Sequence, residues 1–185
     1  MTAPRVVTLT PNPSLDRALH LERLAVGEVN RAAATHLHPG GKGINVSRAL
    51  AAHGVASRAV MPSGGPDGAQ VVALLAAQGV DARPVPVAGD TRSNITLTES
   101  SGATTKINAP GAALTPDEVA ALLAAVESEL AGATAVVAAG SLPAGLGDDF
   151  FTAVADLGAR HGVPVVLDTS GAPFAARSGT AASRW

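Results

Sequence analysis

The 185-residue sequence predicts an α/β fold, with a parallel β-sheet flanked by helices and a small β appendage beside it. Three observations predict this class. Short apolar runs typical of buried strands recur along the chain, and segments of helical spacing alternate with them. Two more polar segments, residues 17–36 and 83–108, interrupt the alternation and are typical of antiparallel ribbons.

Four apolar runs are the expected strands of the parallel sheet. The first is RVVTLT at residues 5–10, which is rich in β-branched residues and ends at the turn-forming sequence PNPS. The second covers residues 58–61. The runs ATAVVAA at 133–139 and VPVVL at 163–167 are apolar throughout, so we expect both strands to be covered on both faces.

Four segments of helical spacing alternate with these strands. Residues 43–53 and 69–78 are each followed by a glycine, and the sequence PSGGPDG is expected to form a loop before the second of them. The clearest helix follows Thr115, which can cap it, with Pro116 at the first helical position and Glu118 completing a capping box. This helix ends before Gly132, and residues 149–161 form the fourth.

The pattern of the second ribbon predicts a hairpin made of SNITLTE, the turn SSG and ATTKIN. The alternation of side chains along a strand gives the hairpin one apolar face, expected to pack, and one polar face. The apolar face holds Ile95, Leu97 and Ile107, and the polar face holds Arg92, Asn94, Lys106 and Asn108. We therefore expect the appendage to offer two cations and two amides on one side.

Composition excludes several classes of function. The formal net charge is -2 and no basic run occurs, which argues against nucleic acid or an acidic membrane surface as a partner. The absence of cysteine excludes disulfides and thiolate metal sites. No apolar run approaches the roughly 20 residues that span a bilayer, and the N-terminal residues lack the pattern of a signal peptide. A cytoplasmic protein is the expectation.

The stretch HPGGKGINVSRAL, residues 38–50, leads a glycine-rich loop into a helix. A P-loop is excluded because Gly43, rather than Ser or Thr, follows Lys42. A dinucleotide fingerprint is excluded because the third glycine is missing and the loop does not follow the first strand. A plain turn and a ligand site both stay open. The chemistry favours a ligand site, since adjacent glycines expose main-chain amides, and Asn45 and Asp16 can hydrogen-bond sugar hydroxyls.

Seven motifs occur in order along the chain: TLTPNPSLD (8–16), GEVNR (27–31), PGGKGINVSRAL (39–50), GDTRSNIT (89–96), TKIN (105–108), AGSLPAG (139–145) and LDTSG (167–171). Together they resemble the PfkB carbohydrate kinases of the ribokinase-like fold, and most of all the bacterial 1-phosphofructokinase and tagatose-6-phosphate kinase branch. The resemblance extends to about residue 176. With the strand and helix pattern, it implies an incomplete α/β core of residues 1–16, 37–82 and 109–176, a β lid of 17–36 and 83–108, and an irregular tail of 177–185.

The resemblance also implies roles for individual residues, and the polar ones suit a phosphorylated sugar. Arg92 would clamp the substrate's phosphate with its forked guanidinium. Asn94 and Lys106 are weaker candidates on the same lid face, with ordinary solvated lid residues as the alternative. Asp168 matches a carboxylate associated with magnesium nucleotide, with a helix-capping or turn aspartate as the alternative. The expected substrate contacts are completed by Asp16, Gly40, Gly41, Lys42, Asn45 and Ser141.

The reaction implied by the family is transfer of the ATP γ-phosphoryl group, with Mg²⁺, to a hydroxyl of a phosphorylated ketohexose. Among the candidate substrates, fructose 1-phosphate, which would be converted to fructose 1,6-bisphosphate, is favoured over tagatose 6-phosphate and fructose 6-phosphate. The family's catalytic aspartate lies in a Gly-Ala-Gly-Asp motif, which these 185 residues do not contain. No catalytic residue is therefore assigned, and the chain alone is expected to be inactive.

After LDTSGAPFAA the sequence reads RSGTAASRW, which has neither strand nor helix periodicity. We expect the C-terminal part of the family fold to be missing, through truncation, a frameshift or deliberate shortening. Two alternatives to a kinase portion stay open. One is a non-catalytic module that binds a sugar phosphate or forms a homodimer through the lid, and the other is a remnant without function.

Overall fold

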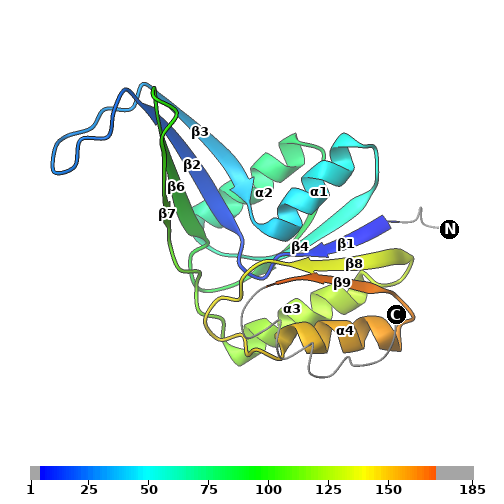
Figure 1. The fold of residues 1–185 in the computed structure, drawn as a ribbon. Coiled ribbons are helices and arrows are strands. Elements are labelled where there is room, and N and C mark those ends of the chain that lie inside the picture. Colours follow the sequence, from blue (N-terminus) through cyan, green and yellow to red (C-terminus); the bar gives the residue numbers. More distant parts are fainter. Residues whose placement is uncertain (1–4, 170–185) are drawn as a thin grey trace.

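The computed structural model describes residues 5–169 and has the predicted α/β architecture (Figure 1). Its larger sheet contains five parallel strands in the order β5-β4-β1-β8-β9. These strands are β1 (Arg5–Leu9), β4 (Ser57–Ser63), β5 (Asp81–Pro86), β8 (Ala133–Ala139) and β9 (Val165–Asp168). The predicted tail, residues 177–185, lies outside the described residues.

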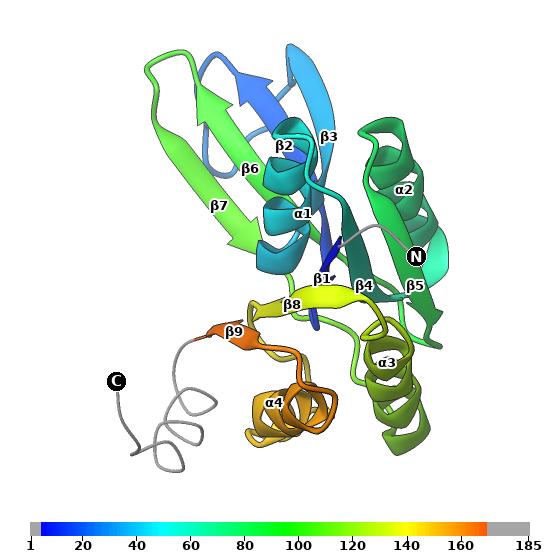
Figure 2. The same ribbon diagram turned by 90° about the vertical axis from the view of Figure 1, so that its right-hand side faces the viewer.

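Helices cover both faces of this sheet, as Figures 1 and 2 show. On one face lie α1 (Lys42–Ala52) and α2 (Gly65–Ala77), and on the other lie α3 (Pro116–Ser128) and α4 (Phe150–Arg160). Side chains alternate along β1, so Val7 and Leu9 belong to the core on the α3 and α4 side. Thr8 faces α1, where its buried hydroxyl shares a hydrogen bond of 2.8 Å with Ser47. Among residues 5–169, no helix is long and apolar enough to cross a bilayer.

The lid is a separate four-stranded sheet in the order β3-β2-β6-β7. Its strands are β2 (Ser14–Leu21), β3 (Ala34–Gly40), β6 (Arg92–Glu99) and β7 (Thr104–Asn108). Ile95 pairs with Ile107, and Asn94 pairs with Asn108, so the predicted hairpin and its two faces are confirmed. The apolar face is only partly covered, since Ile107 is 54% exposed.

Three expectations about the elements are corrected. Helix α2 begins at Gly65 rather than at residue 69, because Pro66 occupies its first turn. N–H groups in the first turn have no acceptor within the helix, so the N–H that proline lacks is not needed there. Residues 83–86 belong to β5 of the larger sheet and not to the lid, because they pair in parallel with β4. Strand β9 is not covered on both faces, since Val166 is 56% exposed, and among residues 5–169 it is one of the two edge strands of the larger sheet.

The two edges of the larger sheet differ in their free hydrogen-bonding groups. Val87 directly follows β5, and its N–H donates to Ser63 O of β4 at 3.2 Å. Because N–H groups alternate in direction along a strand, every second N–H counted back from Val87 also points toward β4. Pro84 and Pro86 occupy the alternate positions, which removes donors from the outer edge. Strand β9 contains no proline. Within residues 5–169, no strand pairs with its outer side.

The predicted capping box at the start of α3 is confirmed, and it reaches beyond the helix. Thr115 Oγ1 accepts from Glu118 N, while Glu118 Oε2 accepts from Thr115 N at 2.8 Å. Glu118 Oε1 also accepts from Ala88 N at 2.6 Å, which ties the segment after β5 to α3. These main-chain N–H groups, Thr115 first and Ala88 second, lower the pKa of Glu118.

We expect the Glu118 carboxylate to make stability depend on acid pH. A lowered pKa in the folded state means that the contribution is present above the unfolded-state pKa of glutamate, about 4.3, and is lost as the pH falls through the lower folded pKa. Urea unfolding at pH 6 should therefore show Glu118→Gln less stable than the parent chain, with the difference shrinking toward pH 3. A difference that stays constant between these pH values would contradict the expectation.

Candidate functional site

A cavity of about 300 Å³ opens where the carboxyl ends of β1 and β8 meet the base of the lid. Open α/β sheets bind their ligands at this end of the strands. The β1–β2 connection, β2, the start of α1, β6 and the segment after β8 all contribute side chains. The cavity is lined by Asn12, Ser14, Asp16, Gly41, Lys42, Asn45, Arg92, Asn94, Gly140 and Ser141. The structure thus brings together most of the predicted site residues.

The Asp16 carboxylate is held by two neighbours through one oxygen only. Ser14 Oγ donates to Asp16 Oδ1 at 2.7 Å, and Asn94 Nδ2 donates to the same atom at 3.0 Å. Asn94 Nδ2 also lies 3.0 Å from Ser14 Oγ, which closes a three-residue cluster. Among residues 5–169, no group hydrogen-bonds Asp16 Oδ2. The second oxygen is therefore free to accept hydrogen bonds from a ligand.

The glycines of the loop before α1 allow close packing around this carboxylate. Gly40 does not line the cavity, yet a Cβ on it would overlap the Asp16 carboxylate and the Ser14 hydroxyl. Gly41 has φ 125°, which favours glycine, and a Cβ there would approach Thr10 Cγ2 to 2.5 Å. No side chain caps α1. Lys42, the first residue of α1, lines the cavity, and its main-chain N–H has no helical acceptor.

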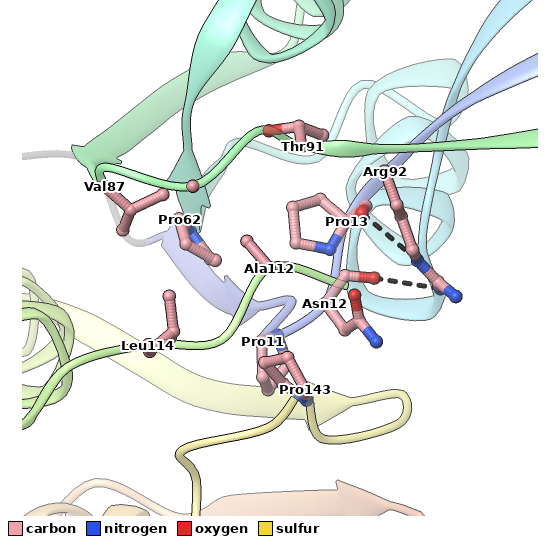
Figure 3. A pocket seen from close by; sticks show the side chains of 11 residues that line it. Pro11, Asn12, Pro13, Pro62, Val87, Thr91, Arg92, Ala112, Leu114 and Pro143 are labelled. Carbon is pink, nitrogen blue, oxygen red and sulfur yellow. Dashed lines mark hydrogen bonds between the residues drawn. The ribbon is translucent and has the colours of Figure 1, made fainter. Parts of the chain in front are cut away.

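Arg92 lines the cavity, but its guanidinium hydrogen bonds go to main-chain carbonyls. Figure 3 shows two of these bonds in a view of the neighbouring pocket, which Arg92 also lines. Nη1 donates to Ala109 O at 3.1 Å, Nη2 to Asn12 O at 3.1 Å, and Nε to Pro13 O at 3.4 Å. Burial lowers the pKa of Arg92, and the nearby Asp16 carboxylate partly offsets this. Arginine stays protonated in proteins, and each terminal nitrogen keeps one further N–H for a ligand.

Besides Gly40, two more predicted residues lie outside the cavity lining. Lys106 lies on β7, which strand β6 separates from β2, and it pairs with Thr96 of β6. Its side chain is exposed. Asp168 ends β9, and its Oδ1 accepts a hydrogen bond from Lys42 Nζ at 3.0 Å. Both side chains of this ion pair are more than half exposed, so it contributes little to stability. Lys42 nevertheless connects Asp168 to the edge of the cavity.

Residues 10–182 match the model of the pfkB family carbohydrate kinases. The chain belongs to the PfkB family. It is 40% identical over 169 residues to an ATP-dependent 6-phosphofructokinase isozyme 2 of Mycobacterium tuberculosis, covering 91% of this chain and 50% of the relative. It is 38% identical over 166 residues to the 1-phosphofructokinase of Bacillus subtilis, covering 90% of this chain and 54% of the relative.

Among solved structures, the phosphofructokinase-2 of Escherichia coli in complex with fructose-6-phosphate superposes with a TM-score of 0.88 at 35% identity. That match covers 94% of this chain and 57% of the other. The PfkB chain described here therefore spans about half the length of the curated relatives it matches. The predicted fold class and family are confirmed.

Of the residues predicted for this PfkB chain, only Asp168 is expected to associate with magnesium nucleotide. Within residues 5–169, no group of three or more His, Cys, Asp or Glu side chains could hold a metal ion. Asp168, the carboxylate expected to associate with the nucleotide, is paired with Lys42 at 3.0 Å. In kinase sites magnesium is held by one or two carboxylates together with waters and the substrate phosphates, so Asp168 would be one such ligand. We therefore assign no step of the chemistry to a metal or nucleotide held by the described residues.

Three residues of the PfkB site were not predicted: Asn12, Ser14 and Gly140. Ser14 stands two residues before Asp16 on β2, so strand periodicity alone would have placed both on one face. Gly140 has φ 120°, which turns the chain after β8 so that Ser141 reaches the cavity. Asn12 lies in the sequence PNPS, where it was interpreted as a turn residue, and no local pattern distinguishes it from one.

Proposed function

We propose that this chain provides the sugar-phosphate-binding part of an ATP-dependent kinase that acts on a phosphorylated ketohexose, with fructose 1-phosphate as the preferred substrate. The observation that carries the proposal is that Asp16, whose Oδ2 has no hydrogen-bond partner among residues 5–169, lines the same cavity as Asn45 and Ser141. A carboxylate oxygen with no other partner can accept hydrogen bonds from two neighbouring hydroxyls of a sugar.

The rest of the cavity suits the phosphate already on such a sugar. Lys42 and the two spare N–H groups of Arg92 supply positive charge. The uncapped start of α1 adds main-chain N–H groups and the positive end of the helix dipole. The cavity thus combines a group that accepts hydrogen bonds from sugar hydroxyls with groups that bind an anion.

In the proposed reaction the γ-phosphoryl group leaves the β-phosphate oxygen of ATP and forms a bond to a hydroxyl oxygen of the sugar, whose proton passes to a base. The PfkB base belongs to the Gly-Ala-Gly-Asp motif, which is absent from the 185 residues. We therefore propose that the chain alone binds the sugar phosphate without phosphorylating it, while ATP and Mg²⁺ belong to the reaction of a complete enzyme.

Isothermal titration calorimetry of the 185-residue chain tests this function. Fructose 1-phosphate should bind more tightly than fructose 6-phosphate or tagatose 6-phosphate, and fructose without phosphate should bind least. ATP with Mg²⁺ should give no turnover of fructose 1-phosphate. Equal affinity for fructose and fructose 1-phosphate would contradict the proposed phosphate-binding site. Tighter binding of fructose 6-phosphate would favour the activity named for the Mycobacterium tuberculosis relative.

A second role is favoured by the lid, whose apolar face leaves Ile107 54% exposed. We propose that two copies of the chain pair through this face, forming a homodimer. Ile107→Glu should convert the dimer to a monomer in sedimentation equilibrium, because it places a charge on the paired surface. Thr104→Glu, an exposed substitution on the opposite face of the same strand, is the matched control. An unchanged mass for Ile107→Glu would contradict the pairing.

A further inference from the structure

Asn12 donates a side-chain hydrogen bond to the Ser141 hydroxyl. The Asn12 side chain lies in the turn between β1 and β2 and is only 8% exposed. Its Nδ2 donates to Ser141 Oγ at 3.2 Å, across the base of the cavity that both residues line. Among residues 5–169, no other group hydrogen-bonds the Ser141 hydroxyl.

The position of the Asn12 side chain is set by its surroundings on two sides. Arg92 Nη2 donates to the main-chain oxygen of Asn12 at 3.1 Å, which Figure 3 shows with the two residues side by side. Gly111 packs directly against the carboxamide, since a Cβ on Gly111 would overlap Asn12 Oδ1. The carboxamide therefore has little room to rotate.

A hydroxyl that already accepts a hydrogen bond has its own proton free for another partner. Because Asn12 Nδ2 occupies a lone pair of Ser141 Oγ, the Ser141 proton is left to be donated into the cavity. Phosphate and sugar oxygens are acceptors, so this orientation suits a ligand that presents an oxygen to Ser141. Without Asn12 the hydroxyl could rotate and present a lone pair instead, which an anion disfavours.

We propose that Asn12 is a positioning residue, which makes the Ser141 hydroxyl a donor to the bound sugar phosphate. This inference rests on the proposed function, because it requires a ligand in the cavity. It assigns to Asn12 no contact with the reacting atoms. Its effect passes through Ser141 alone, and this makes the role separable from a purely structural one.

A double-mutant cycle tests the proposal, with fructose 1-phosphate titrated calorimetrically into the full 185-residue chain. Asn12→Ala and Ser141→Ala should each weaken binding by about tenfold, as expected for the loss of one hydrogen bond to a charged group. The double variant should bind no more weakly than Ser141→Ala, because Asn12 has nothing left to orient. Gln70→Ala removes an exposed carboxamide on α2, outside the cavity lining, and is the control expected to leave affinity unchanged.

Asn12→Asp provides a nearly isosteric second variant if the alanine variant unfolds. A carboxylate only accepts hydrogen bonds, so it would draw the Ser141 proton toward itself, and the affinity should fall at least as far as with alanine. Equal losses from Asn12→Ala with and without Ser141 would show a structural role, and an unchanged affinity of Asn12→Asp would show no role. Failure of the parent chain to bind would instead overturn the proposed function and remove this inference with it.

Discussion

Asp16→Asn is expected to weaken fructose 1-phosphate binding by about a hundredfold or more while leaving the fold intact. The free Oδ2 is the acceptor proposed for two sugar hydroxyls, and hydrogen bonds to a charged group are each worth about 1.5–3 kcal/mol. Asparagine has nearly the same shape, but it carries no charge and replaces one acceptor with a donor. Because Ser14 Oγ and Asn94 Nδ2 both donate to Oδ1, they would hold the asparagine oxygen at that position and place its NH2 group where Oδ2 now is. Calorimetric titration measures the loss.

Gly40→Ala is the companion variant for Asp16. Its backbone φ lies outside the left-handed region, so alanine introduces no backbone strain, but its Cβ would overlap the Asp16 carboxylate. The same loss of affinity should follow from displacing Asp16 as from neutralising it. A thermal unfolding profile recorded for each variant separates lost binding from lost folding. If Asp16→Asn bound fructose 1-phosphate as tightly as the parent chain, the proposed role of this carboxylate in binding sugar hydroxyls would be contradicted.

Glu129→Gln is expected to lower the free energy of unfolding by about 3 kcal/mol, the size found when one partner of a buried ion pair is removed. Glu129 is 8% exposed, at the opposite end of the sheet from the cavity. Its Oε2 accepts from Arg5 Nη2 at 2.7 Å and from Arg58 Nε at 3.3 Å. Neutralising it would leave two half-buried guanidinium groups facing one another without a shared anion. Urea denaturation at neutral pH measures the change.

Asp81→Asn is the matched control for Glu129. Asp81 also pairs with Arg58, but its side chain is 64% exposed, and exposed ion pairs contribute about 0–1 kcal/mol. The same chemical change should therefore be far less costly at residue 81 than at residue 129. If the two variants lost equal stability, the burial of Glu129 would not be the reason for its contribution.

Much of this fold could be predicted because local patterns agree with the final packing. The capping box at Thr115 is a purely local signal, and helix α3 begins where it predicts. The errors came where local sequence conflicts with tertiary context. Gly65 and Pro66 are typical of a loop, yet they start α2. The apolar run ending at Leu167 has the composition of a central strand, while its place at an edge depends on neighbours that sequence composition does not reveal.

The candidate site was predictable to the extent that its residues lie in motifs of the PfkB family. Asp16 and Asn45 come from separate motifs and line one cavity. Motif reasoning could not reveal that the Arg92 guanidinium is largely occupied by carbonyl groups, because main-chain acceptors carry no signature in the side-chain sequence. It also gave Asn12 no role, since its partner Ser141 lies 129 residues away.

The prolines of β5 and their absence from β9 give the sheet one direction in which another strand can pair. If two molecules paired through the outer sides of β9, the prolines of β5 would disfavour the addition of a third copy at the far edge of either larger sheet, as far as residues 5–169 are concerned. A sheet with two open margins can instead assemble end to end into fibres.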